Sequence, residues 1–282
     1  MPQKTIELLQ LGQTANLRDK YRKGNVIYLG DEGDIVITGD IHGHRRNFER
    51  IVSFAKLDSN PERHLILQEI IHGGPTDEEG RCLSYELLFD VIQYKLQYPD
   101  NVHILMSNHD TSFICNSEIM KDGREMNLAM RQALDEKFGD KSEDVKMAIT
   151  EYLLSQPLAV KCNNGLWASH SLPSERNWDK FDTAIFEREI VVDDLMRTGS
   201  VYLLTWGRNQ SQKLLNNAAE KLGVKTFVLG HQSQPDGWLK AGENLIIIAS
   251  DHSHGCLIIC DLNKSYTAEE LKNKIVALSS IL

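Results

Sequence analysis

Strand-like and helix-like segments alternate between residues 34 and 107, and this alternation restricts the folds open to the chain. Apolar runs that favour strands occupy residues 34–39, 64–71 and 102–107. Stretches that favour helices lie between them, near residues 46–57 and 82–97. Strands and helices that take turns in this way are typical of βαβ units, whose strands form a parallel sheet. We therefore expect an α/β fold.

The rest of the chain adds strands to this unit. Residues 158–161 and 166–169 flank Asn163-Asn164-Gly165, and an Asn-Gly pair between apolar runs predicts a hairpin. Further strands are expected at residues 226–229, 245–249 and 256–260. The sequence has no internal repeat, low-complexity segment or obvious linker, so we expect a single domain over residues 1–282.

Four further segments are expected to lie outside the central sheets of this domain. Residues 1–33 are interpreted as a peripheral N-terminal segment that contains a short amphipathic helix. Residues 112–157 are predicted to be a helical insertion with a break at Gly139-Asp140, and residues 175–200 a polar surface insertion. Thr267-Ala268-Glu269-Glu270 is a helix-start signal, so residues 263–282 are predicted to form a C-terminal helix.

The net charge and the cysteine content argue against several classes of protein. The net charge of -9 argues against a nucleic-acid binder and against binding to an anionic membrane surface. The five cysteines are odd in number and form no CxxC, which favours reduced thiols and a cytoplasmic protein. The sequence shows no signal-peptide pattern and no apolar run that approaches the length of a membrane span.

Metal-binding side chains follow several predicted strands. Gly39-Asp40-Ile41-His42-Gly43 comes directly after strand 34–39, and its glycines allow a sharp turn. Carboxylate and imidazole groups together suit Mn, Fe or Zn. Five candidate ligands share a position at the carboxyl end of a predicted strand: Asp40, Glu69, Asn108, His170 and His231. Because open α/β sheets bind ligands at that edge, we expect a metal site there.

These motifs resemble those of the calcineurin-like metallophosphoesterases, most closely the phosphoprotein phosphatase branch. That family carries GDxHG, GDxVDRG and GNHE, followed by two separated metal histidines. Gly39-Asp40-Ile41-His42-Gly43 matches the first motif, and Ser107-Asn108-His109-Asp110 resembles the third. Ala168-Ser169-His170 and Gly230-His231-Gln232 resemble the segments with the two histidines, and Leu203-Leu204-Thr205-Trp206 resembles a family segment just before the second. The resemblance spans roughly residues 34–260.

The resemblance implies a fold, a metal centre and a reaction. The fold would have two central mixed β-sheets packed face to face and flanked by helices, with the metal site at the carboxyl ends of strands. Two divalent or trivalent ions would bind, with manganese expected and iron or zinc as alternatives. A hydroxide that bridges the metals would attack the phosphorus of a phosphate monoester in a protein or a small molecule.

The family's site roles are carried over residue by residue. Asp40 and His42 would bind the first metal, and Asn108, His170 and His231 the second. His109 would protonate the leaving oxygen as the general acid.

The second family motif has changed in this chain. GDxVDRG falls on Gln68-Glu69-Ile70-Ile71-His72-Gly73-Gly74. The resemblance implies that Glu69 replaces the aspartate that bridges the metals, and that His72 replaces the aspartate that orients the catalytic histidine. An imidazole brings no fixed negative charge, so His109 should be less basic than usual. Gly73 replaces the arginine that holds the phosphate, and Arg208 or Arg45 is the expected substitute.

Three functional hypotheses remain open. The first is a metal-dependent phosphatase similar to the Ser/Thr protein phosphatases. The second is a dinucleoside polyphosphate hydrolase, which would need space for a purine and further cations near the metals. The third is a catalytically weak, metal-dependent binding or scaffold protein. His64 and His103 are interpreted as structural, and Trp167 and Trp206 as core residues.

Overall fold

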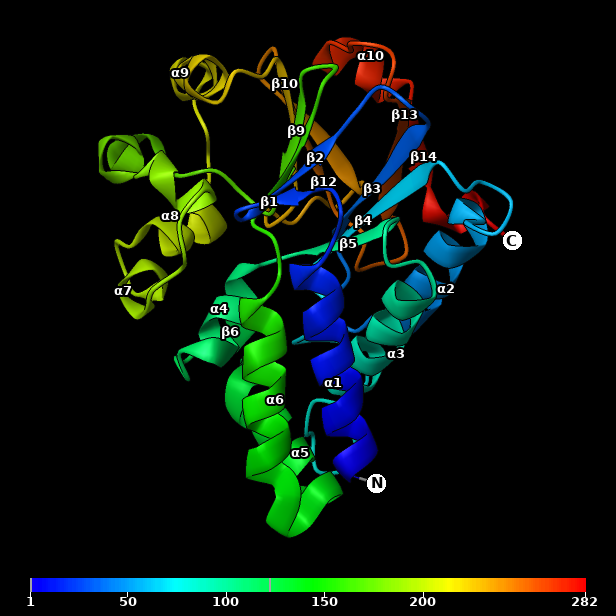
Figure 1. Cartoon of the computed structure of the whole chain (residues 1–282), viewed down its shortest axis with the longest axis vertical. Coiled ribbons are helices and arrows are strands. Elements are labelled where there is room, and N and C mark those ends of the chain that lie inside the picture. Colours follow the sequence, from blue (N-terminus) through cyan, green and yellow to red (C-terminus); the bar gives the residue numbers. More distant parts are fainter. Residues whose placement is uncertain (1, 122) are drawn as a thin grey trace.

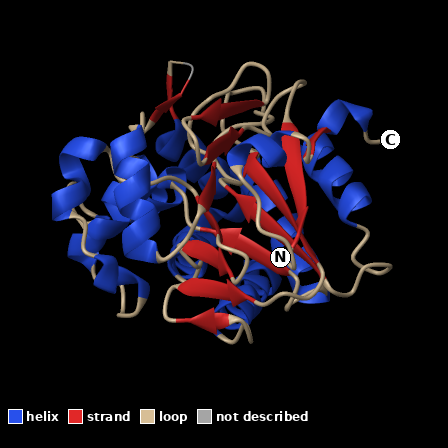
Figure 2. Ribbon diagram, turned by 90° about the horizontal axis from the view of Figure 1, so that it is seen from above, coloured by secondary structure: helices blue, strands red, loops and turns tan. Residues whose placement is uncertain are grey.

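The computed structural model describes residues 2–121 and 123–282. Its central feature is a pair of mixed β-sheets with helices on both outer sides (Figures 1 and 2). This is the α/β architecture that the sequence motifs predict.

The five-stranded sheet contains the predicted βαβ units. Its strand order is β14 (Ile275–Ala277), β13 (Cys256–Asp261), β3 (Asp34–Asp40), β4 (Arg63–Gln68) and β5 (Val102–Leu105). Strands β3, β4 and β5 are parallel, and β13 pairs antiparallel with both β3 and β14. Helices α2 (Arg45–Ala55) and α3 (Ser84–Gln97) connect the parallel strands, which confirms the expected alternation.

The seven-stranded sheet contains the predicted hairpin. Its order is β1 (Arg22–Lys23), β2 (Val26–Leu29), β8 (Ala159–Cys162), β9 (Leu166–Ser169), β10 (Thr226–Leu229), β12 (Leu245–Ile248) and β11 (Trp238–Ala241). Strands β8 and β9 pair antiparallel around the Asn-Gly turn, whereas β9, β10 and β12 are parallel. The edge strand β11 was not predicted because its half-exposed residues follow no apolar pattern.

The strands are apolar along their length because both of their faces are buried. In β3, Ile35 and Ile37 belong to the core between the sheets, and Val36 to the core under the helices. In β12, Ile246 faces the same inter-sheet core, whereas Leu245 joins the core on the far side of the seven-stranded sheet. This two-sided burial explains why the sequence shows continuous apolar runs.

Helices cover the outer face of each sheet. On the five-stranded sheet these are α1 (Pro2–Leu17), α2, α3, α5 (Met126–Phe138) and α6 (Ser142–Leu154). On the seven-stranded sheet they are α8 (Ser200–Trp206) and α9 (Gln212–Leu222), with the short α7 (Val192–Leu195) nearby. The 175–200 segment also contributes buried side chains to this layer, namely Phe181, Ile185, Phe186 and Leu195.

The N-terminal segment is more integral than its sequence predicts. Helix α1 packs against α3 and α6, with Leu9 buried between them. A Cβ at Gly12 would lie 2.7 Å from Ile92 Cγ2 and 3.0 Å from Tyr152 Cε2, so the glycine allows close helix packing. Strand β2 pairs in parallel with β8. Residues 2–29 therefore contribute a helix to the layer over the five-stranded sheet and two edge strands to the seven-stranded sheet.

Two other expectations change in detail. The helical segment after residue 107 comprises α4 (Asn108–Ile114), α5 and α6, with a 3₁₀ turn at Gly139–Lys141, and it also contains a small hairpin of β6 (Met120–Lys121) and β7 (Arg124–Glu125). The C-terminal helix α10 (Ala268–Lys272) starts at the predicted Thr267 cap but is short. It ends early because the next residues pair with β13 as β14.

All five cysteines are free thiols, and four of them are buried. Among the described residues, no helix combines the length and apolar character required to cross a membrane.

Candidate metal centre

The two sheets join where β3 ends, and a glycine permits the contact. A Cβ at Gly39 would lie 2.0 Å from the carbonyl oxygen of Ile248 on β12, so a larger residue would separate the strands. Asp40 then forms a parallel bridge with Ala249, and the Ser250 amide donates to the Asp40 carbonyl at 3.1 Å. The first motif is therefore fixed at the junction between the sheets.

The candidate site residues leave their strands through unusual backbone conformations. His42, Glu69, His72 and His231 have φ angles of 46°, 48°, 63° and 65°. Residues other than glycine rarely adopt this left-handed conformation, which costs energy unless the surrounding structure enforces it. Such strain is typical of functional sites.

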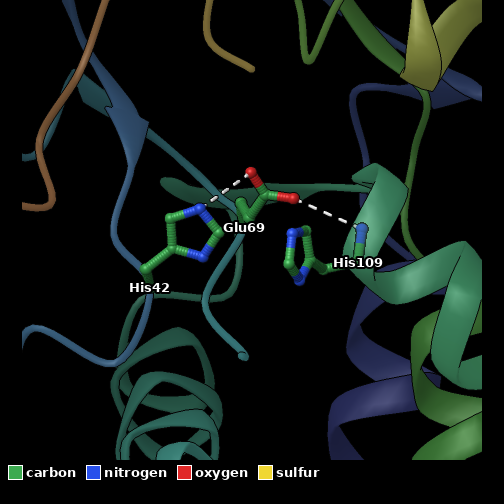
Figure 3. Close-up of side chains that lie close together, drawn as sticks. All are labelled: His42, Glu69 and His109. Carbon is green, nitrogen blue, oxygen red and sulfur yellow. Dashed lines mark hydrogen bonds and ion pairs between the residues drawn. The ribbon is translucent and has the colours of Figure 1, made fainter. Parts of the chain in front are cut away.

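Glu69 lies between two groups of histidines. It is almost completely buried, and its Oε2 atom is 3.3 Å from His42 Nε2 (Figure 3). Its Oε1 atom is 3.6 Å from His170 Nε2 and accepts from the His109 amide at 3.3 Å. Burial raises the pKa of Glu69 well above its usual range, and the neighbouring charge of Asp40 adds to the shift.

His170 anchors the second group. Its Nε2 atom lies 2.7 Å from Asn108 Oδ1 and 3.2 Å from His231 Nδ1. Burial lowers the pKa of His170 well below its usual range, and the positive charges of His231, His42 and Arg208 lower it further. The ring is therefore neutral, which is the protonation state that ligates metals.

The hydrogen bonds around Gln68 fix which His170 nitrogen carries the proton. The Gln68 amide nitrogen donates to the Thr38 carbonyl at 2.8 Å, so its oxygen accepts from His170 Nδ1 at 2.9 Å. His170 Nε2 consequently presents a lone pair, and it faces the oxygens of Asn108 and Glu69. The oxygens of Asn108 and Glu69 are acceptors that converge on this lone pair, and a cation among them relieves their repulsion. This donor set fits a metal ion.

Asp40 connects the two groups. Its Oδ1 atom accepts from the His231 amide at 2.8 Å and lies 3.6 Å from His170 Nδ1. Its Oδ2 atom is 4.0 Å from His42 Nε2. A Cβ at Gly230 would lie 2.4 Å from Asp40 Oδ1 and 2.8 Å from Gln68 Oε1, so the space for both side chains depends on this glycine.

Within residues 2–121 and 123–282, two triads of histidine and carboxylate groups have ligand atoms close enough to hold an ion. One comprises His42, Glu69 and His109, and the other comprises Glu69, His170 and His231. Glu69 belongs to both. His109 lies within the first triad, so its geometry permits a ligand role as well as the expected acid role.

His72 and His109 are in contact, as their expected partnership requires. Their Nδ1 atoms are 3.0 Å apart. Burial and the charge of His42 lower the pKa of His72 to about 3. Burial also lowers the pKa of His109 well below its usual range, with further contributions from the charges of His42, His72 and Lys121.

The structure places the two candidate arginines in different surroundings. Arg208 Nε donates to His231 Nε2 at 3.1 Å, so this guanidinium lies at the second histidine group. The Arg45 guanidinium instead pairs with Asp90 on α3 and lines a surface pocket with Tyr85 and Phe89. Phosphate binding by Arg45 would require this ion pair to open.

Two features of the site were missed by the sequence interpretation. Gln68, the orienting partner of His170, ends an apolar strand, and a polar residue at that position was the available signal. Lys121 on β6 lines a cavity together with His42 and pairs with Asp251 at 3.6 Å. No apolar pattern marks the two-residue strand that carries Lys121, so its position at the site could not be predicted from the sequence.

Solved phosphatase structures have the same fold. A protein serine/threonine phosphatase from Saccharomyces cerevisiae, described as similar to human phosphatase PP5, aligns with a TM-score of 0.66 at 13% identity and covers 93% of this chain and 83% of its own. A cold-active protein-tyrosine phosphatase from a psychrophilic Shewanella species aligns with a TM-score of 0.60 at 17% identity, covering 89% of this chain and 82% of its own. At these identities the similarity shows the fold alone.

The family assignment comes from the sequence match. The family described as calcineurin-like phosphoesterase matches residues 33–235, which include all the candidate ligands from Asp40 to His231. Its members are hydrolases of phosphate esters, and the imidazole and carboxylate groups described above provide the donors that a metal-dependent member needs. On this match and this fold, the chain belongs to the calcineurin-like phosphoesterase family.

Proposed function

We propose that this protein is a two-metal phosphatase that hydrolyses phosphate monoesters. The observation that carries the proposal is the position of Glu69, whose two carboxylate oxygens face separate histidine groups at 3.3 and 3.6 Å. A buried carboxylate is costly unless it is paired or coordinates a cation. A carboxylate shared by two ions accounts for both its burial and its contacts.

The remaining ligands divide between the two ions. Asp40 and His42 would hold the first, and Asn108, His170 and His231 the second, with Glu69 shared. When bound, two such ions supply positive charge for the phosphate oxygens and lower the pKa of a water molecule. Manganese is the proposed metal, and iron or zinc suits the same donors.

His109 is proposed to protonate the leaving oxygen. The His109 backbone is tied to Glu69 by a 3.3 Å hydrogen bond, and its ring contacts His72 through Nδ1. This arrangement holds the ring at the site and leaves Nε2 for a proton transfer. His72 is proposed as a positioning residue because it acts through His109.

Arg208 is proposed to bind the phosphate in place of the arginine that the second motif lacks. Its guanidinium is exposed and hydrogen-bonded to a single imidazole nitrogen. A metal held by His231 Nδ1 would place the ring proton on Nε2, which could then no longer accept from Arg208. The guanidinium would be released for a bidentate contact with phosphate.

The proposal is tested by metal content and turnover together. The purified chain should bind close to two equivalents of Mn²⁺ and hydrolyse p-nitrophenyl phosphate and phosphoserine peptides. Glu69→Gln should lose metal and at least ~100-fold in turnover. Glu62→Gln, at an exposed position, is the matched control and should retain both. Full metal content with no turnover on any phosphate ester would contradict the proposal and support the scaffold hypothesis.

A pocket beside Arg208 supports the alternative hypothesis of a dinucleoside polyphosphate hydrolase. A cavity of about 430 Å³ beside Arg208 is lined by Arg176, Tyr202 and Trp206. The rings of Tyr202 and Trp206 are stacked, with centroids 5.4 Å apart and planes at 17°. Trp206 is thus half-buried at a cavity, whereas Trp167 is in the core as expected. A purine could stack here, and both arginines could contact phosphates.

Comparing substrates separates the two activities. A dinucleoside polyphosphate hydrolase should act on diadenosine tetraphosphate with at least ~10-fold higher kcat/KM than on p-nitrophenyl phosphate. Trp206→Leu should then raise KM for the dinucleotide alone. Equal rates on both compounds, or no effect of Trp206→Leu, would favour the monoesterase.

A further inference from the structure

A cavity on the His42 side of the metal centre, distinct from the cavity beside Arg208, is lined by two basic side chains. It has a volume of about 480 Å³, and its lining includes His42 of the first triad together with Lys121, Arg124 and Asp251. It shares no lining residue with the cavity at Arg208. The proposed reaction uses neither Lys121 nor Arg124.

Two cations stand directly opposite each other on the β6–β7 hairpin. Lys121 and Arg124 are cross-strand partners, so their side chains share one face of the hairpin. Like charges in this position repel, and they do so here in a chain whose net charge is -9. Asp251 offsets part of this charge through its 3.6 Å contact with Lys121. Arg124 forms no ion pair with any other residue of 2–121 and 123–282.

Another part of the cavity wall consists of two glycines, Gly73 and Gly74. A Cβ at Gly73 would lie 2.5 Å from the His42 carbonyl oxygen, and one at Gly74 would lie 2.3 Å from the Gly43 carbonyl oxygen. The first and second motifs are therefore in direct contact, and a side chain at Gly73 is excluded by His42. The two glycines add no side chains to the cavity that Lys121 and Arg124 line.

We propose that this cavity binds a second anionic group of the substrate. The inference rests on the proposed function, because the first anionic group is the phosphate that is hydrolysed. Lys121 and Arg124 would hold a further phosphate or a carboxylate next to His42, and Asp251 would be displaced from Lys121. The substrate class is thus a phosphate ester that carries another acidic group close to the scissile phosphate, either a small polyanion or a phosphopeptide with an acidic neighbour.

Paired substrates test this specificity. Phenyl phosphate and 3-carboxyphenyl phosphate differ by one carboxylate, and the second should show about tenfold higher kcat/KM. Lys121→Gln and Arg124→Gln should each reduce this ratio about fivefold, and Lys121→Arg should retain it. Lys141→Gln, whose lysine pairs with Asp144 at the surface, is the matched control. A ratio that neither cavity variant changes would overturn the proposal.

A second comparison of substrates distinguishes a small polyanion from an acidic phosphopeptide. A phosphoserine peptide with an adjacent aspartate is compared with one that has asparagine there. If only the small carboxylated ester depends on Lys121 and Arg124, the physiological ligand is a small polyanion. If the peptide pair shows the same dependence, an acidic phosphopeptide is supported. If neither pair depends on these residues, the cavity has no role in specificity.

Binding without turnover distinguishes failure of this proposal from failure of the proposed function. Benzylphosphonate and 3-carboxybenzylphosphonate are not hydrolysed, and calorimetry on the protein as purified gives their affinity ratio. A ratio that falls about fivefold in Lys121→Gln supports the anion subsite even if no ester is hydrolysed. Turnover on phosphate esters combined with an unchanged ratio would retain the proposed function and remove the subsite.

Discussion

The Nδ1 atoms of His72 and His109 lie 3.0 Å apart, so a single proton lies between two buried imidazole rings. His72 Nε2 has no hydrogen-bond partner within the described part of the chain. The group that contacts the proposed acid is therefore a neutral ring held by one polar contact. A carboxylate at this position would act differently, because its charge would favour the protonated form of His109.

His72→Asp should make His109 more basic. The new carboxylate favours the imidazolium, so the pKa of His109 rises and the acid stays protonated to higher pH. We expect the alkaline limb of the kcat/KM profile to move up by about one pH unit. His72→Asn adds no charge and should not move that limb upward. A profile that is the same in both variants would show that His72 does not act on the protonated group.

His109→Asn should reduce turnover without removing the metals. Loss of a general acid costs about 10²- to 10⁴-fold, and the loss should be greater for phenyl phosphate than for p-nitrophenyl phosphate, whose leaving group needs less protonation. Metal analysis is needed as well because His109 lies in a triad with His42 and Glu69. If the variant loses one metal and both substrates slow equally, His109 is a ligand and the acid role is wrong.

The sequence predicted the parts of the site that follow strands in regular order. Asp40 and His42 come after an apolar run with a glycine on each side, and that local pattern places them. The role of Gln68 depends on the packing of two sheets, which brings His170 from a strand 102 residues later to its side. Nothing in the local sequence records this contact. The positions of Lys121 and Arg124 could not be predicted either. Each lies on a two-residue strand, which is too short to show an alternating pattern of apolar and polar residues.

The same limit applies to the outer parts of the fold. The cap at Thr267 predicts where α10 begins, but its early end depends on the pairing of residues 275–277 with β13. Residues 1–33 were interpreted as a peripheral segment with a short amphipathic helix. The packing of α1 depends on Gly12, which allows the helix to approach α3 and α6 closely, and β2 is placed by its pairing with β8. In both segments tertiary contacts decide the outcome.

Gly230→Ala should damage the metal centre through crowding alone. The added methyl group would overlap Asp40 Oδ1 and Gln68 Oε1, and it would displace a ligand or the partner that orients His170. We expect metal affinity to fall about 10- to 100-fold and stability to fall by about 1–3 kcal/mol. Gly30→Ala is the control, since a Cβ at that exposed position meets no atom within 4 Å. Titration with Mn²⁺ and chemical denaturation measure the two effects, and wild-type affinity in Gly230→Ala would contradict the crowding argument.

A buried polar cluster away from the metal centre should make stability depend on pH. His64 Nδ1 lies 3.1 Å from His103 Nε2, and His103 Nδ1 lies 2.9 Å from Asp19 Oδ2. Lys95 is 3.5 Å from the same Asp19 oxygen, and the Tyr21 ring packs edge-on against His64. Burial, aided by the neighbouring charge of His103, lowers the pKa of His64 to about 3.

The sign of the effect follows from this lowered pKa. An unfolded histidine titrates near pH 6.5, so below that pH the unfolded chain binds a proton that folded His64 takes up only near pH 3. Stability is retained above about pH 6.5 and is lost as the pH falls through this window, by about 2 kcal/mol between pH 7 and pH 5. The pKa of Asp19 is lowered by its contacts with His103 and Lys95, which outweigh its burial, so its contribution is lost only at lower pH.

His64→Gln should remove this part of the pH dependence. Glutamine can still hydrogen-bond to His103 but does not titrate, so the free energy of unfolding of the variant should fall by about 2 kcal/mol less than that of the wild type between pH 7 and pH 5. Urea denaturation at several pH values measures the difference, with His254→Gln at an exposed position as the matched control. The buried histidines of the metal centre lie outside this cluster and titrate equally in wild type and variant, so the difference reports the contacting pair His64 and His103. Parallel stability curves would mean that His64 is protonated in the folded protein at pH 5.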